Sequence, residues 1–198
     1  PNTQGLNAEG IGIEFDRKAI RTDAHMRTNI PHIYAIGDVN GKVMLAHTAS
    51  HEGMVAVADI CGQGEEMRYD RIPSCVYLEP EIACIGLTEA QAREKYGDGL
   101  KIGRFNMAAN GKSLILNGGE GLVKIIAGKE YGEVLGMHII GPRATDLIAE
   151  GALAIGGEMT LDEIVATIHS HPTVTESVRE CALDALGRAV HIPPRKKK

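Results

Sequence analysis

The segment from His169 to Glu176 combines side chains that can move protons. Pro172 disfavours helical geometry at His171, so this stretch is expected to be a loop. Glu176 follows five residues after His171, in the first turn of a predicted helix, and its carboxylate can reach back to an imidazole nitrogen. Such a carboxylate fixes the histidine tautomer and favours the protonated ring, so the histidine can accept a proton and hold it. Beside a thiol, the pair would generate a thiolate at neutral pH.

Spacing alone also allows simpler interpretations. His169 and His171 can be surface histidines next to a helix N-terminus, where Glu176 only complements the helix dipole. A second polar position, Gly37-Asp38, follows the apolar run at residues 33–36 and can be an ordinary turn. The residue types by themselves leave these alternatives open.

The elements that must position these residues differ between the two parts of the chain. In residues 1–70, short strands are expected at 11–15 and near 20–22, a buried strand at 33–36, and an amphipathic helix from Leu45 to about Ile60. Residues 68–73 are expected to be a linker. We interpret residues 1–70 as the C-terminal remnant of a cofactor-binding domain, on the resemblance described below.

After Pro73, strands come in a run and helices follow in a run. This order predicts an α+β fold, an antiparallel sheet with helices on one face. The second domain is expected at residues 71–190, with a basic tail at 191–198. Strands are predicted at 75–78, 82–85, 100–106, 121–126 and 134–140, and helices at 88–96, 145–155, 161–168 and 175–186.

Composition excludes several classes of function. The net charge of −5 gives no general attraction to nucleic acid or anionic lipid, and aromatic residues are scarce (4%, no Trp). No apolar run is long enough for a membrane span, and no metal-ligand spacing occurs. The four cysteines form no C-x-x-C or C-x4-C pair, so we expect buried, reduced thiols and prefer a cytoplasmic location over the mitochondrial matrix.

The motif His-x-His-Pro-Thr-x-x-Glu resembles the C-terminal signature of the pyridine-nucleotide–disulfide oxidoreductases. A histidine two residues before the His-Pro points to the dihydrolipoamide dehydrogenase branch, although a specificity like that of glutathione reductase stays as an alternative. The resemblance implies that His171 is the catalytic base, that Glu176 orients it, and that the bond before Pro172 is cis.

A flavin site is implied by the same resemblance. In this family a short strand ends in Gly-Asp, and the Asp accepts hydrogen bonds from the ribityl chain of FAD, as Gly37 and Asp38 would here. Met44, Leu45, Ala46 and His47 resemble the segment at which a helix begins beneath the flavin. The positive end of that helix can stabilise negative charge on reduced flavin.

Other features of the family do not occur in this sequence. It contains no Gly-x-Gly-x-x-Gly fingerprint for FAD or NAD and no C-x4-C redox disulfide. We therefore expect that the chain is a C-terminal part of such an enzyme and that it is inactive alone. The resemblance implies a homodimer that acts on dihydrolipoamide and binds the lipoyl acyltransferase subunit of 2-oxo acid dehydrogenase complexes. A stand-alone dimerisation or docking module is the alternative.

Overall fold

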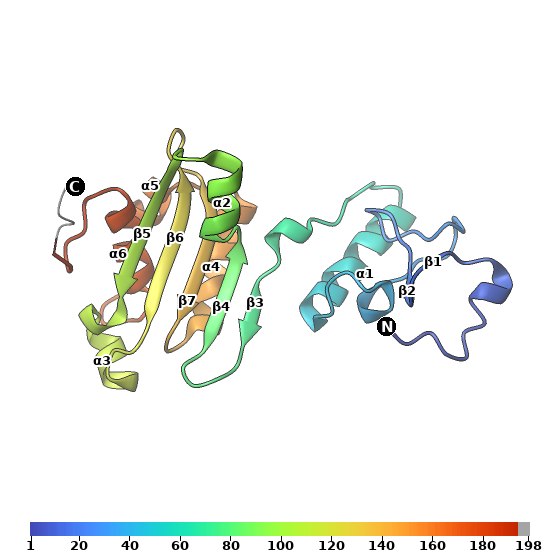
Figure 1. Cartoon of the computed structure of the whole chain (residues 1–198), viewed down its shortest axis with the longest axis horizontal. Helices are drawn as coiled ribbons and strands as arrows, with labels where there is room; N and C mark the ends of the chain where they lie inside the picture. The colour runs from blue at the N-terminus through green and yellow to red at the C-terminus, as the bar shows by residue number, and fades with distance from the viewer. Residues whose placement is uncertain (194–198) are drawn as a thin grey trace. The chain divides into compact units, whose positions relative to one another are not determined.

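The computed structural model describes residues 1–193 and divides the chain into two compact units, Pro1–Tyr69 and Asp70–Lys198 (Figure 1). The expected basic run at residues 195–198 lies outside the described residues. Within residues 1–193, no helix is both long and apolar enough to cross a membrane.

The first unit contains one long helix and several short elements. A 3-10 helix, η1 (Glu9–Ile11), precedes a two-residue hairpin of β1 (Phe15–Asp16) and β2 (Ala19–Ile20). The predicted strand at 11–15 is wrong except at Phe15, since Ile11 ends the 3-10 helix and is 55% exposed. Alternating apolar residues do not make a strand without a neighbouring strand to pair with.

The expected buried strand at residues 33–36 is also wrong. Tyr34 forms only an isolated antiparallel bridge with Arg27, and Ile36 is 43% exposed. With one short segment as its partner, this stretch makes too few backbone hydrogen bonds to count as a strand. It leads into the 3-10 helix η2 (Gly37–Asn40).

Helix α1 (Ala46–Ile60) follows, with the bounds that the sequence predicts to within one residue at its start. Its buried face includes Val55 and Ala58, and it packs against η2. The loop before η2 is also tied to the end of this helix, because Arg27 forms two hydrogen bonds with Asp59 and the hydroxyl of Tyr34 donates a third. These bonds fix the approach of the chain to Gly37.

The second unit is built on a five-stranded antiparallel sheet, as the sequence predicts. The strand order is β3-β4-β7-β6-β5, so β3 and β5 are the edges. The hairpin β6–β7 and its neighbours place alternate side chains on one buried face. The strands are β3 (Ser74–Val76), β4 (Ile82–Gly86), β5 (Leu100–Asn106), β6 (Leu122–Gly128) and β7 (Val134–Ile140).

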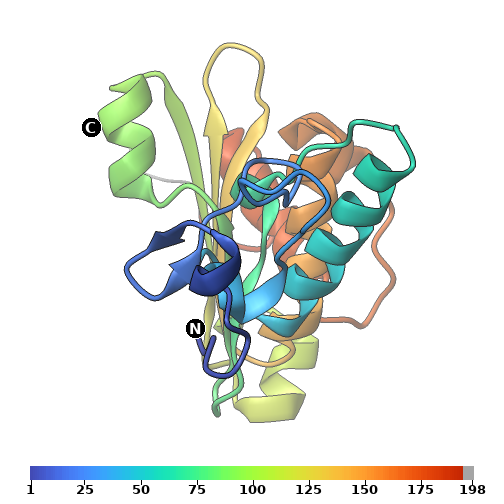
Figure 2. The same cartoon turned by 90° about the vertical axis from the view of Figure 1, so that its right-hand side faces the viewer.

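Helices α4 (Ala144–Gly156), α5 (Leu161–Ala166) and α6 (Glu176–Ala185) cover one face of this sheet. The exception is the short α2 (Glu89–Tyr96), which lies on the opposite face (Figure 2). Helix α3 (Gly111–Asn117) connects β5 to β6 and was not expected from the sequence. A 3-10 turn, η3 (Tyr69–Arg71), leads into the unit, and another, η4 (Met107–Ala109), precedes α3.

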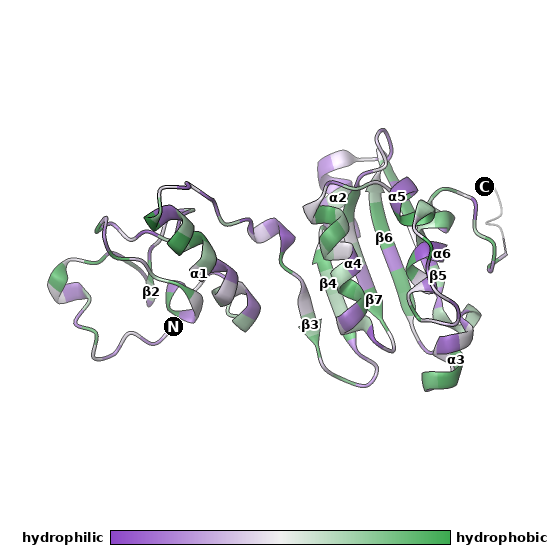
Figure 3. Cartoon of the chain, turned by 180° about the vertical axis from the view of Figure 1, so that it is seen from behind, coloured by the Kyte–Doolittle hydropathy of each residue, from purple (hydrophilic) through white to green (hydrophobic). Residues whose placement is uncertain are grey.

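The core lies between the sheet and α4–α6. Apolar residues run along β4 and β6 in the view coloured by hydropathy (Figure 3). Burial of such side chains is the main stabilising contribution to a sheet–helix layer. Fully buried members include Phe105, Ile125, Met137, Ile139, Ile148 and Val178.

Helix α6 lies unusually close to β5. A Cβ built on Gly103 would come within 2.0 Å of the carbonyl oxygen of Cys181, so only glycine permits this approach. The carboxylate of Asp184 also accepts the backbone N–H of Arg104 at 2.8 Å. These contacts fix α6, and with it Glu176 at its start, against the edge of the sheet.

Candidate functional site

The loop between α5 and α6 carries the motif that the sequence singles out. The His171–Pro172 bond is cis, as predicted. The hydroxyl of Thr173 donates to the carbonyl of Ser170 at 2.7 Å, which closes the turn around the proline. His171 is thereby presented at the tip of the loop, with 78% of its side chain exposed.

Glu176 holds the imidazole of His171. Nδ1 of His171 lies 2.9 Å from Oε1 of Glu176, and Oε2 of the same carboxylate accepts the backbone N–H of Thr173 at 2.9 Å. A carboxylate at Nδ1 selects the tautomer with its proton on that nitrogen and leaves Nε2 as an acceptor. The arrangement is that of an oriented general base.

The charge of Glu176 is favoured by its surroundings. Partial burial opposes ionisation, but the N–H of Thr173, the hydrogen bond with His171 and the nearby charges of His171 and His191 outweigh it and lower the pKa of Glu176. Glu176 also lies in the first turn of α6, where the helix dipole stabilises a negative charge. The ionised carboxylate can therefore accept a hydrogen bond from the Nδ1–H group of His171.

His169 does not join His171 on Glu176. Its side chain is only 5% exposed, and its two ring nitrogens face two acceptors: Nε2 lies 2.9 Å from Glu150 on α4, and Nδ1 lies 3.0 Å from the carbonyl of Thr167. Both nitrogens must carry protons to satisfy these partners, so the imidazolium is the preferred form. The hydrogen bond with Glu150 accordingly outweighs burial and raises the pKa of His169.

A cavity of about 270 Å³ lies behind this loop. Glu176 and His169 contribute to its wall, together with residues that sequence reasoning missed. No fixed spacing links the missed residues to the His-Pro motif, since they come from α4, from the next turn of α6 and from the chain after α6. In the wall they are Glu180 and His191, which pair with each other, and the partner of His169 on α4, Glu150, was missed as well.

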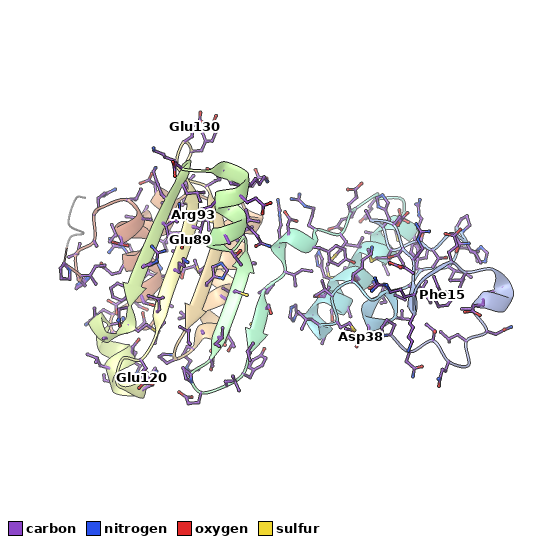
Figure 4. The ribbon with its side chains drawn as sticks, viewed as in Figure 1. Phe15, Asp38, Glu89, Arg93, Glu120 and Glu130 are labelled. Carbon is purple, nitrogen blue, oxygen red and sulfur yellow. The ribbon has the colours of Figure 1, made fainter. Side chains whose placement is uncertain are left out.

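In the first unit, the positions expected to meet a flavin lie at the start of η2 and around the start of α1. Gly37 has a φ of +73°, and a Cβ at this position would lie 3.2 Å from Ala49 on α1, so glycine suits the turn. The N–H of Gly37 donates to the fully buried Glu52 at 2.6 Å. Asp38, next in the chain, is exposed (Figure 4).

The start of α1 is open to a ligand. No side chain caps the helix at Leu45, and Met44 is 59% exposed. Ala46 and His47 form the exposed beginning of the first turn. The hydroxyl of Thr48 is buried without a hydrogen-bond partner among the described residues. An uncapped helix start with an unsatisfied polar atom is suited to an acceptor-bearing group.

The cysteines and potential metal ligands offer no further centre in the described part of the chain. None of the four cysteines is in a disulfide, and Cys181 is buried, where its thiol donates to the carbonyl of Val123 at 3.3 Å. The expectation of four buried thiols is wrong for Cys61, which is exposed. Within residues 1–193, no group of three or more side chains is placed to hold a metal ion.

Both parts of the chain match known protein families. Residues 72–182 match the dimerisation domain of the pyridine nucleotide-disulphide oxidoreductases, and residues 1–53 match the pyridine nucleotide-disulphide oxidoreductase domain. Two curated relatives are dihydrolipoyl dehydrogenases. That of Bacillus subtilis is 47% identical, and the match covers 96% of this chain and 42% of the relative. That of Haloferax volcanii is 42% identical, and the match covers 96% of this chain and 40% of the relative. The chain thus spans about two fifths of the length of these relatives.

Solved structures show the same fold. LpdA from Mycobacterium tuberculosis is 29% identical with a TM-score of 0.86, over 92% of this chain and 40% of that one. The flavoprotein disulfide reductase RclA from Escherichia coli has a TM-score of 0.84, and the match covers 92% of this chain and 42% of that one. At 23% identity, this likeness supports the fold alone. Since the dimerisation-domain match covers more than half of the sequence, the chain belongs to the pyridine nucleotide-disulphide oxidoreductase family.

Proposed function

We propose that the protein takes part in the oxidation of dihydrolipoyl groups by NAD⁺, with His171 as the general base and Glu176 as the residue that orients it. The observation that carries this proposal is the 2.9 Å contact between Nδ1 of His171 and Oε1 of Glu176, on an imidazole that is 78% exposed. The identity of 42–47% to dihydrolipoyl dehydrogenases supports the choice of substrate.

In the proposed step, Nε2 of His171 accepts the proton of a dihydrolipoyl thiol. The resulting thiolate attacks a disulfide, forming one S–S bond and breaking another, and the protonated imidazole stabilises the thiolate that is released. Glu176 holds the Nδ1 proton throughout, which favours the doubly protonated ring. None of the four cysteines of this chain is in a disulfide, so the disulfide in the proposed step would come from cysteines outside it.

FAD is the cofactor that we propose for the first unit. Asp38 would accept hydrogen bonds from ribityl hydroxyls, Gly37 would allow close approach of the backbone, and the start of α1 from Met44 to His47 would face the flavin ring. The exposed Asp38 and the uncapped helix fit these roles. When bound, FAD supplies electron transfer between the dithiol and NAD⁺.

The chain alone is expected to bind FAD weakly or not at all, because it has no glycine fingerprint for the adenine half of the cofactor. Absorbance of the purified chain after incubation with FAD tests this expectation. Tight binding of one FAD per chain would contradict it.

We further propose a homodimer and a macromolecular source for the substrate. The family match is to a dimerisation domain. The dihydrolipoyl group would be presented by the acyltransferase subunit of a 2-oxo acid dehydrogenase complex. Four free thiols are compatible with a reducing compartment, and the cytoplasm is the location that we favour.

A chimera tests the activity directly. The part of the Bacillus subtilis dihydrolipoyl dehydrogenase that precedes the matched region is fused to this chain, and reduction of NAD⁺ by dihydrolipoamide is followed. Turnover that disappears in the His171→Gln chimera is the expected result. A chimera that folds and binds FAD, but turns over equally well with and without His171, would overturn the assignment.

Specificity is decided in the same preparation. Dihydrolipoamide with NAD⁺ is compared with glutathione disulfide and NADPH. Preference for the glutathione pair would replace the lipoamide proposal with that of a glutathione-reductase-like enzyme. A chain that binds an acyltransferase subunit while every chimera stays inactive would instead favour a docking module.

A further inference from the structure

Helix α6 presents a second carboxylate one turn after Glu176. Glu176 and Glu180 are four residues apart, so they lie on the same side of the helix. Glu180 is only 3% exposed, although it carries no part in the proposed proton transfer. Two carboxylates at this spacing repel each other, and burial of the second makes its charge harder to sustain.

The chain after α6 returns to cover Glu180. Gly187 has a φ of +68°, which allows the chain to reverse at the helix end. The backbone N–H groups of Val190 and His191 then donate to Oε2 of Glu180 at 3.2 and 3.0 Å. Ile192 packs against the apolar core, so the segment is held by both polar and apolar contacts.

The side chain of His191 completes this arrangement. Its Nδ1 lies 2.9 Å from Oε1 of Glu180, at ion-pair distance but without the angles of a hydrogen bond. The imidazole itself is 63% exposed, so water can exchange protons with it. His191 therefore brings a side chain that can carry a positive charge to a buried carboxylate.

Both carboxylates border the same cavity of about 270 Å³. Three histidine–carboxylate pairs contribute side chains to its wall: His169 from its pair with Glu150, Glu176 from its pair with His171, and both members of the pair His191–Glu180. Among residues 1–193, Arg179 is the one permanent cation in its wall, and its Nε donates to the carbonyl of Val165. Compensation of the three negative charges thus depends mainly on the histidines.

We propose that His191, seated on Glu180, is a positioning residue for the His171–Glu176 pair, because its positive charge lets Glu176 stay a carboxylate beside a second buried carboxylate. The proposal rests on the proposed function only for its consequence in catalysis. The segment after α6 would then help to set the charge state of the acid–base site.

The electrostatics agree with this geometry. Burial opposes ionisation of Glu180, but the N–H and side-chain contacts of His191 and the N–H of Val190 outweigh it and lower the pKa of Glu180. The charge of His191 also contributes to the lowered pKa of Glu176. Its contribution acts together with those of Thr173 and His171.

The other charged groups around the cavity have partners of their own. On α4, Glu150 is occupied by His169, and on α5, Asp162 lies 3.8 Å from Arg188. His191 is thus placed to act on both Glu176 and Glu180, since it contacts Glu180 and its charge is among the causes of the lowered pKa of Glu176.

The test measures the titration of Glu176 in the full 198-residue chain by ¹³C NMR of its carboxyl carbon. At the acidic pH where carboxylates titrate, an exposed imidazole carries its positive charge. His191→Gln removes this charge and should move the titration of Glu176 to higher pH. His191→Lys restores a positive charge and should return the titration toward that of the unchanged chain. His32→Gln, at an exposed histidine in the other unit, is the matched control and should leave it unchanged.

The two His191 variants separate charge from packing. If the segment only covered Glu180 by packing, His191→Gln and His191→Lys would shift the titration alike, and that result overturns the proposal. An unchanged titration in His191→Gln overturns it as well. Amide spectra of α6 report whether each variant is folded.

The NMR measurement does not depend on catalysis, so it stands if the chimera is inactive. In an active chimera, His191→Gln should move the acidic limb of the pH–activity profile to higher pH, and His191→Lys should restore it. A uniform loss of activity at all pH values would indicate a merely structural role.

Discussion

Glu176 binds His171 through one carboxylate oxygen and the backbone of Thr173 through the other, both at 2.9 Å. The second bond fixes the carboxylate to the same loop that carries the histidine. The imidazole can therefore protrude from the protein, 78% exposed, without losing its orientation. A base that must meet a substrate from outside the chain needs this combination.

The first prediction concerns the relative weights of these two residues. In the chimera, His171→Gln should lower turnover of dihydrolipoamide by about 10²–10⁴, the usual contribution of a general base. Glu176→Gln should cost less, roughly 10–100-fold, by analogy with carboxylates that orient metal-bound imidazoles. Steady-state kinetics with saturating NAD⁺ measure both. A larger loss for Glu176→Gln than for His171→Gln would mean that the carboxylate itself moves the proton.

The second prediction is the pH dependence of the His169–Glu150 pair. The pKa of His169 is raised from its ordinary value of 6.5, so the pair stabilises the fold fully below pH 6.5 and loses this contribution as pH rises through the folded value. Glu150→Gln should lower the free energy of unfolding by about 2 kcal/mol at pH 6. The deficit should shrink by pH 9.

Urea unfolding followed by circular dichroism measures this, since the chain has no Trp. Glu130→Gln, at an exposed position of the β6–β7 turn (Figure 4), is the control with little expected effect. An equal deficit for Glu150→Gln at both pH values would show that the pair is not charged at pH 6.

The third prediction concerns the face of the sheet that α2 covers. Glu89 lies beside Arg93 on α2 (Figure 4) and also contacts Arg104 and Lys124 from the strands. The hydrogen bond with Lys124 contributes most, and with the other two cations it lowers the pKa of Glu89 to about 2. Because the folded value lies below the ordinary 4.5, the stabilisation is complete above pH 4.5 and declines as pH falls toward 2.

Glu89→Gln should therefore lower the free energy of unfolding at pH 7 by about 1 kcal/mol and by much less near pH 2. Glu94→Gln, exposed on the same helix, should have little effect at either pH. A deficit for Glu89→Gln that did not change with pH would assign the contribution to packing rather than to charge.

The fourth prediction tests the close contact of α6 with β5. Gly103→Ala places a methyl group against the carbonyl of Cys181 and should destabilise the second unit by about 1–3 kcal/mol. Gly156→Ala is the matched control, because a Cβ there meets nothing within 4 Å. The control should be neutral or slightly stabilising. Equal urea midpoints for the two variants would show that α6 can move away from the strand at little cost.

The fifth prediction is the association of the chain. Light scattering behind a sizing column should give twice the monomer mass of 21.2 kDa if the dimerisation domain associates in this chain. A clean monomer at micromolar concentration would show that the second unit does not associate by itself. Dilution distinguishes a stable dimer from a weak one, because obligate interfaces bury roughly 2,000 Å² or more.

Local patterns predicted much of the second unit. Two of the predicted helices begin at Thr88 and just after Thr160, and both threonines form full capping boxes, with Gln91 and Glu163. The strands were predictable because each has an apolar face and a neighbouring strand. Helix α3 could have been found from Asn110, whose side chain accepts from Ser113, and from the left-handed Gly118 at its end.

The rest depends on contacts between distant residues. The two histidines of the motif are only two positions apart, yet His169 bonds to α4 and His171 to α6. No periodicity indicates that Glu150 lies beside His169, or that the chain reverses after α6 to place His191 on Glu180. Such pairs are set by tertiary packing, so a sequence motif locates the loop but not all of its partners.

The hydrogen bond from Arg104 to Asp184 also affects how this molecule meets others. β5 is an edge strand, and a free edge can recruit a strand from another molecule. At Arg104 the backbone donor is already taken by a carboxylate that is 7% exposed. To pair with β5 at this position, a strand from another molecule would have to displace the carboxylate of Asp184 from the N–H of Arg104. Helix α6, which carries Glu176, therefore also hinders the pairing of further strands with the β5 edge of the sheet.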